Sequence, residues 1–107
     1  MIKLDKQNIS PADAKKRLAE EKGIVLLDVR RSEEFAVGHI EGSMLIPLGI
    51  IEKEAQLQLK DKNATIFVYC HSGRRSKIAA DILVKQGYVN VLNLGGIIDW
   101  PYETVAI

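Results

Sequence analysis

The sequence predicts a single α/β domain, with a central, mainly parallel sheet flanked by helices on both faces. First, the chain has 107 residues, the length of one domain. Second, short apolar segments alternate along the chain with segments of helical spacing, the order typical of a parallel sheet. Third, the run IVLLDV at 24–29 is apolar without alternation, as in a parallel strand covered on both faces.

The first helix and the first strand have clear boundaries. Ser10 is a helix cap, Pro11 suits the first helical position and Asp13 suits the first turn, so we expect a helix from Pro11 that ends before Gly23. The strand over 24–29 follows directly.

The next segment predicts shorter elements. Ser32 is expected to cap a brief helix that Gly38 stops, and residues 43–46 are expected to form a short strand. Apolar residues at helical spacing predict one amphipathic helix over 48–60, closed by a turn at 61–63.

The last third predicts strand, loop, helix and strand. Residues 65–69 are rich in β-branched and aromatic side chains, and residues 76–85 return to helical spacing until Gly87. A strand over 90–94 ends at a pair of glycines, and the segment after it is expected to pack Trp100 onto the core.

Composition excludes several classes of function. A formal net charge of +1 disfavours nucleic acid and membrane partners, which attract a clustered basic face. No segment has the apolar length of a signal peptide or a membrane span, so the cytoplasm is the expected compartment. One cysteine and two histidines argue against an internal disulfide and against a protein-only metal site. We expect a monomer.

The candidate site is the loop after the strand at 65–69, where a parallel sheet places its ligands. Cys70 enters this loop from the strand, Gly73 allows a tight turn, and Arg75 places a cation at the rim. Backbone amides at the start of the next helix are expected to form a bowl that favours the thiolate of Cys70. The alternative is a cysteine that only fills the core, but its place at the end of a strand argues for a nucleophile.

The loop CHSGRRS at 70–76 resembles the active-site loop of rhodanese-family sulfurtransferases, with four residues between the cysteine and the arginine. The resemblance extends to LLDVR at 26–30, EFAVGHIEGSMLIPL at 34–48 and NLGGIIDWP at 93–101. Glu41 departs from the family, which often has proline there, and this affects one turn outside the loop.

The resemblance implies that residues 1–107 form a single rhodanese domain with a three-layer fold. It implies that Cys70 takes sulfur from thiosulfate or a related persulfide or polysulfide donor, stores it as a persulfide, and passes it to a thiol, cyanide or protein acceptor. Cys70 and Arg75 are then the catalytic residues, and no cofactor or metal is required. The expected substrate-binding residues are His71, Ser72, Gly73, Arg74 and Ser76.

Nearby polar residues are expected to have supporting roles. Arg74 is expected to steer anions or face water, as an auxiliary to Arg75. His39 is expected to hold a turn through a hydrogen bond. Asp28 and Arg30 are expected to form a structural salt bridge with Glu34 or with another loop.

Two other functions remain open. A cysteine, an amide bowl and an arginine also serve phosphatases and arsenate reductases, but relatives that act on phosphate have one more residue in the loop, and no acid or second thiol is evident here. The other alternative is a binding or sulfur-carrier module without turnover, in which Cys70 passes sulfur between proteins.

Overall fold

The structure is a computed structural model that describes residues 7–107. The expectation that the chain opens without a targeting segment falls mostly on residues 1–6, outside that range. The strands are β1 Gln7–Asn8, β2 Val25–Asp28, β3 Met44–Leu45, β4 Ile66–Cys70 and β5 Val91–Gly96. The α-helices are α1 Pro11–Glu20, α2 Ser32–Val37, α3 Ile51–Gln58 and α4 Arg74–Lys85, and the 3₁₀ turns are η1 Leu48–Ile50 and η2 Ile97–Asp99.

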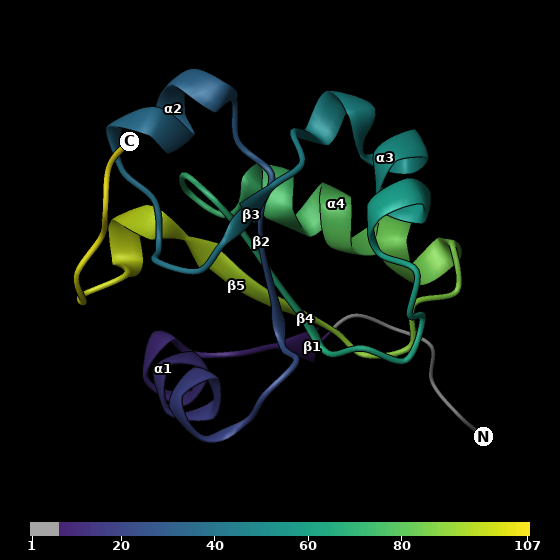
Figure 1. Ribbon diagram of the computed structural model, residues 1–107, viewed down its shortest axis with the longest axis horizontal. Helices are drawn as coiled ribbons and strands as arrows, with labels where there is room; N and C mark the ends of the chain where they lie inside the picture. The colour runs from purple at the N-terminus through teal and green to yellow at the C-terminus, as the bar shows by residue number, and fades with distance from the viewer. Residues whose placement is uncertain (1–6) are drawn as a thin grey trace.

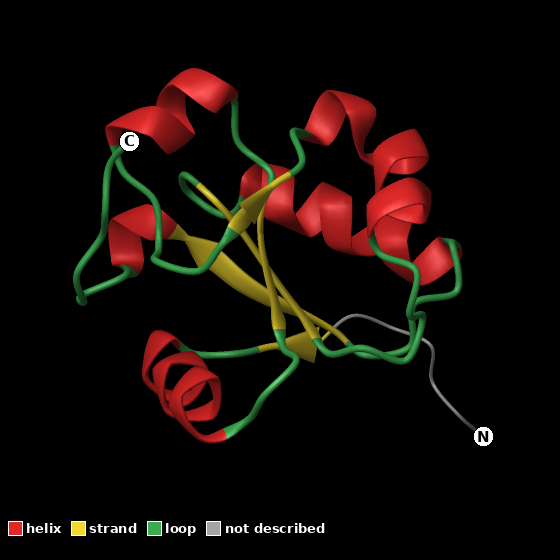
Figure 2. Ribbon diagram, viewed as in Figure 1, coloured by secondary structure: helices red, strands yellow, loops and turns green. Residues whose placement is uncertain are grey.

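The five strands form one sheet in the order β1-β5-β4-β2-β3, and every neighbouring pair is parallel. Helix α1 lies on one face of the sheet, and α3 and α4 lie on the other (Figure 1). Each face buries its own cluster of apolar side chains. The predicted α/β architecture, with a parallel sheet between helical layers, is therefore confirmed (Figure 2).

The start of α1 is as predicted. The backbone N–H of Asp13 donates to Oγ of Ser10 at 3.1 Å, and Pro11 occupies the first turn. Trp100 is also buried as predicted, in the cluster beneath α1.

Two helix boundaries differ from the prediction. Helix α2 is capped by Arg31 and not by Ser32, because the backbone N–H of Arg31 donates to Oε1 of Glu34 at 3.0 Å while the Ser32 hydroxyl donates to Glu33. The helix predicted over 48–60 is divided into η1 and α3, because the backbone of Ile50 at their junction is not helical, with φ of −122° and ψ of 7°.

Two strands also differ. β5 continues through the glycine pair that was expected to end it, because a bulge in its register with β4 and a left-handed Gly95, with φ of 95°, bring Gly96 opposite Cys70. β1 was not predicted, since Gln7 and Asn8 carry no apolar signal and are exposed at the edge of the sheet.

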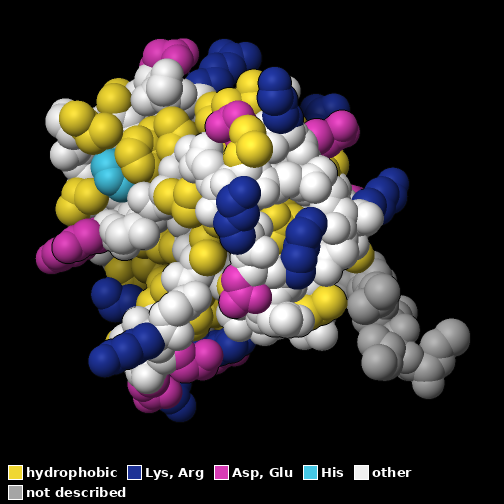
Figure 3. Space-filling view, turned by 45° about the vertical axis from the view of Figure 1, so that its right-hand side comes forward, with side chains coloured by type: hydrophobic (Ala, Val, Ile, Leu, Met, Phe, Trp, Pro, Cys, Tyr) yellow, Lys and Arg dark blue, Asp and Glu magenta, His cyan; other side chains and the backbone are white. Residues whose placement is uncertain are grey.

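The surface carries both signs of charge. On the face in Figure 3, basic and acidic side chains are interspersed, and hydrophobic side chains gather towards one end. Within residues 7–107, no helix combines the length and the apolar character that a membrane span needs.

Candidate active site around Cys70

Cys70 is the last residue of β4, the central strand, so its side chain lies at the carboxyl end of the sheet. The residue is only 1% exposed, and it packs in the apolar cluster beneath α3 and α4. The burial matches the alternative of a core-filling cysteine. The polar groups around its sulfur do not fit that alternative.

Backbone amides converge on the sulfur. The N–H of Gly73 donates to Sγ of Cys70 at 3.0 Å, and the amides of Arg75 and Ser76 in the first turn of α4 also favour its ionised form. Gly73 makes this geometry possible, because its φ of 103° lies in the left-handed region that side chains disfavour. The predicted amide bowl is present, although α4 begins at Arg74, earlier than expected.

The pKa of Cys70 reflects two opposing effects. Burial raises the pKa of the thiol, but the hydrogen bond between the thiol and the Ser76 hydroxyl and those from the amides of Ser76, Gly73 and Arg75 lower it, and the net shift is downward. Oγ of Ser76 lies 3.6 Å from Sγ and within 3.4 Å of the carbonyl oxygens of Gly73 and Gly95. Ser76 is thus fixed beside the sulfur.

The loop rests on the glycine pair of β5. A Cβ added to Gly96 would clash with the carbonyl oxygen of His71 and lie 2.7 Å from Cα of Ser72, so only glycine fits there. The N–H of Ile98 donates to the same carbonyl of His71 at 3.2 Å. The end of β5 therefore determines where the loop lies.

Arg75 is held by a carboxylate. Its guanidinium donates to both carboxylate oxygens of Glu34 in α2, at 2.7 and 2.9 Å. Hydrogen bonds from Arg75 lower the pKa of Glu34 to about 2, despite partial burial. The predicted rim cation is present, but its guanidinium is bound to α2.

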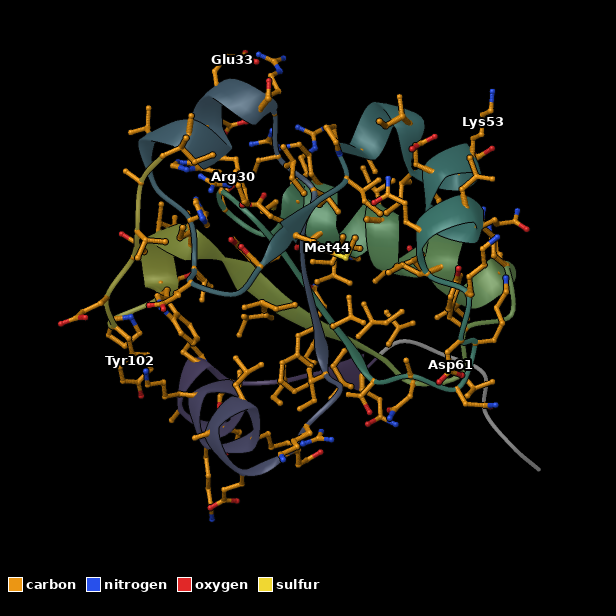
Figure 4. All side chains as sticks on the ribbon, viewed as in Figure 1. Arg30, Glu33, Met44, Lys53, Asp61 and Tyr102 are labelled. Carbon is orange, nitrogen blue, oxygen red and sulfur yellow. The ribbon has the colours of Figure 1, made fainter. Side chains whose placement is uncertain are left out.

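Asp28 and Arg30 form a buried pair with each other, and not with Glu34 as one expectation had it. The Asp28 carboxylate is fully buried and accepts from Nε of Arg30 at 3.1 Å and from Nη2 at 2.8 Å. Arg30 also donates to the carbonyl of Gly38. Arg30 lies beneath α2 near the ends of the strands, whereas Glu33 points away from them (Figure 4). A scaffold role fits both residues.

The other predicted site residues differ in exposure. His71, Ser72 and Arg74 are exposed at the rim, Gly73 is half-buried and Ser76 is buried. The structure brings Gly73, Ser76 and the Arg75 backbone to the sulfur.

Other residues outside the loop complete the site or support it. Nδ1 of His39 lies 2.7 Å from the carbonyl of Phe35, which confirms its expected role in the turn. Glu34 was expected only as a partner of Asp28 and Arg30, and Gly96 only as a glycine that ends a strand, although both lie within motifs that carried the resemblance. Their contacts join segments far apart in sequence, which single-sequence reasoning does not bring together.

Chemically, this arrangement suits a nucleophilic thiolate. A lowered pKa raises the fraction of thiolate at neutral pH, and the surrounding amides can stabilise negative charge on an atom attached to the sulfur.

Comparison with known proteins identifies relatives over most of the chain. The family model for the rhodanese-like domain matches residues 10–102. The putative sulfur carrier protein YrkF of Bacillus subtilis is 42% identical over 84% of this chain, and the thiosulfate sulfurtransferase PspE of Escherichia coli is 40% identical over 68% of it. The matched region spans 48% of YrkF and 70% of PspE.

Solved structures agree in fold. The rhodanese-like domain of the Anabaena protein Alr3790, solved by NMR, superposes with a TM-score of 0.86 at 28% identity, covering 95% of this chain and 80% of that one. A structure described as rhodanese with anions from E. coli superposes with a TM-score of 0.74 at 36% identity, covering 78% of this chain and 99% of that one.

Proposed function

Because this chain belongs to the rhodanese-like domain family, we propose that it is a sulfurtransferase that carries sulfane sulfur as a persulfide on Cys70. Its relatives are named as sulfurtransferases and sulfur carriers. The single observation that carries the proposal is the sulfur of the only cysteine, enclosed by the amides of Gly73, Arg75 and Ser76.

The loading step follows from this geometry. The Cys70 thiolate attacks the outer sulfur of thiosulfate, a new S–S bond forms to Cys70, and the old S–S bond breaks with its electron pair leaving on sulfite. Sulfite is a stable anion, so no general acid is required. The amides that favour the thiolate can then stabilise the negative charge of the persulfide. We assign Arg75 the role of a nearby cation, because its charge interacts with Cys70 while Glu34 holds its side chain in place.

The rest of the loop supports binding of the donor. His71, Ser72 and Arg74 lie at the rim, where an anion such as thiosulfate or a polysulfide would enter. A lone free cysteine also suits a reducing compartment, which supports the cytoplasm as the place of the reaction.

The first prediction tests the intermediate. Reduced wild-type protein incubated with thiosulfate is expected to gain the mass of one sulfur atom, and cyanide is expected to remove it as thiocyanate. The measurement is intact mass before and after cyanide. Cys70→Ser, which removes the nucleophile and nearly conserves volume, is the matched control and is expected to gain nothing.

The result that contradicts the proposal is a wild-type protein that takes up no sulfur from thiosulfate, polysulfide or a protein persulfide. Sulfur uptake by Cys70→Ser would also contradict it, because the sulfur would then bind elsewhere.

A further inference from the structure

A cleft of about 350 Å³ lies beside the Cys70 loop. The start of α2, the segment 47–49 and the first turn of α4 enclose it. Its charged lining consists of the guanidinium groups of Arg30, Arg31 and Arg75 and the carboxylate of Glu34. Cations therefore outnumber anions in this cleft.

The cleft lies beside the strand end that carries Cys70. Val29 lines it and directly follows the last residue of β2, while Cys70 ends the neighbouring strand β4. Both side chains belong to the apolar cluster on the α4 face of the sheet. Adjacent strands are about 4.8 Å apart, so the cleft reaches the residue that lies beside Cys70 in the sheet, and Arg75 from the Cys70 loop also lines it.

The three arginines of the cleft differ in what they already bind. Arg30 is paired with Asp28 and bonded to the Gly38 carbonyl, and Arg75 is paired with Glu34. Arg31 is exposed, and its guanidinium makes no ion pair within residues 7–107. A cation at the amino end of a helix does not stabilise that helix, so helix stability does not explain the presence of an arginine at position 31.

The size of the cleft favours a ligand larger than thiosulfate. Thiosulfate has five heavy atoms, whereas sites of 300 Å³ and above are typical of drug-sized ligands. The cleft shares Leu48 and Gly49 with a second groove, of about 570 Å³, which is also lined by Ile50 and Ile82 and by the charged residues Glu52, Lys53 and Glu54. A ligand in the first cleft can place an anionic group near Arg31.

We propose that this cleft binds the sulfur acceptor, a small thiol that carries a carboxylate, and that Arg31 selects it by pairing with the carboxylate. The inference rests on the proposed function, because the acceptor must meet a persulfide on Cys70. The acceptor thiolate attacks the outer sulfur, forms a new S–S bond, and releases Cys70 as thiolate with the electron pair of the broken bond. No further oxidant or reductant takes part.

The test separates recognition of the acceptor's carboxylate from the sulfur-transfer step itself. Protein loaded with sulfur, and checked by mass, is mixed with 3-mercaptopropionate or with the neutral 2-mercaptoethanol, and the rate of sulfur loss is measured against thiol concentration. Arg31→Gln is expected to raise the KM for mercaptopropionate by about fivefold and to leave the KM for mercaptoethanol and the limiting rate unchanged. Arg31→Lys, which keeps the charge, is expected to restore part of the affinity. Lys16→Gln, on exposed α1, removes one charge far from the cleft and is expected to match wild type.

The outcomes are distinguishable. If the protein never acquires sulfur, the proposed function fails before the inference is tested. If it loads but Arg31→Gln changes neither KM, or changes both equally, the cleft does not select a carboxylate. If Arg31→Gln slows only loading by thiosulfate, the cleft binds the donor and the inference is wrong.

Discussion

At the scale of single residues, the site depends on a thiol that is both buried and favoured as an anion. Burial alone would raise the pKa of Cys70, and the hydrogen bonds around its sulfur outweigh that effect. The sequence was sufficient to predict that Cys70 lies where a strand ends and a loop leads into a helix. It was not sufficient to predict that the hydroxyl of Ser76 lies against the sulfur, which depends on the carbonyls of Gly73 and Gly95.

Ser76→Ala is therefore expected to raise the pKa of the Cys70 thiol, because it removes the hydroxyl that favours the thiolate. The measurement is the rate of alkylation by iodoacetamide as a function of pH. Its midpoint is expected to shift to higher pH, with slower alkylation at neutral pH. Ser72→Ala removes an exposed hydroxyl from the same loop and is expected to leave the midpoint unchanged. Equal midpoints for Ser76→Ala and wild type would show that the amides alone determine the pKa.

At the scale of elements, α2 is joined to α4 through one ion pair. α2 buries none of its residues, so its position depends on polar contacts such as the pair between Glu34 and Arg75. The elements with caps and apolar spacing were predicted well, as α1 and β4 illustrate. β1 was not, because it depends on a partner elsewhere in the sheet, and neither was the division of the 48–60 segment at Ile50.

The pair between Glu34 and Arg75 predicts a specific dependence of stability on pH. The pKa of Glu34 is lowered from 4.5 to about 2 in the folded protein, so the pair stabilises the fold fully above pH 4.5 and progressively less as pH falls towards 2. Glu34→Gln is expected to lower the free energy of unfolding at neutral pH and to flatten its decline between pH 4.5 and 2. The measurement is urea unfolding at several pH values. Glu33→Gln, a neighbouring exposed carboxylate, is expected to keep the wild-type slope, and a Glu34→Gln slope equal to that of wild type would contradict the prediction.

At the scale of the whole molecule, two apolar layers share one central strand. Every residue of β4 is buried, and its side chains alternate between the cluster beneath α1 and the cluster beneath α3 and α4. Packing on both faces explains why the continuous apolar runs predicted a parallel sheet, and it places Cys70 at the end of the most enclosed strand.

This layering predicts the pattern of backbone hydrogen exchange. Amides of β4 are expected to exchange only through global unfolding, and amides of the edge strand β1 about a hundredfold faster through local opening. Hydrogen–deuterium exchange followed by NMR measures both. Similar exchange rates in β1 and β4 would contradict this prediction, because both strands would then open in the same event.

The order of strands also constrains how the protein can form as it is synthesised. β1 pairs only with β5, so Gln7 and Asn8 meet their partners Leu92 and Asn93 across almost the whole described chain. β2 and β4 can join much earlier, since about forty residues separate their starting points. On a ribosome, β4 can thus acquire β2 as a neighbour before β5 has emerged, and the amide bowl around the sulfur gains the support of Gly96 only afterwards. A nascent chain held just short of β5 would have the Cys70 thiol without the supported amide bowl around it. Its reactivity towards sulfur donors would then depend on the emergence of β5.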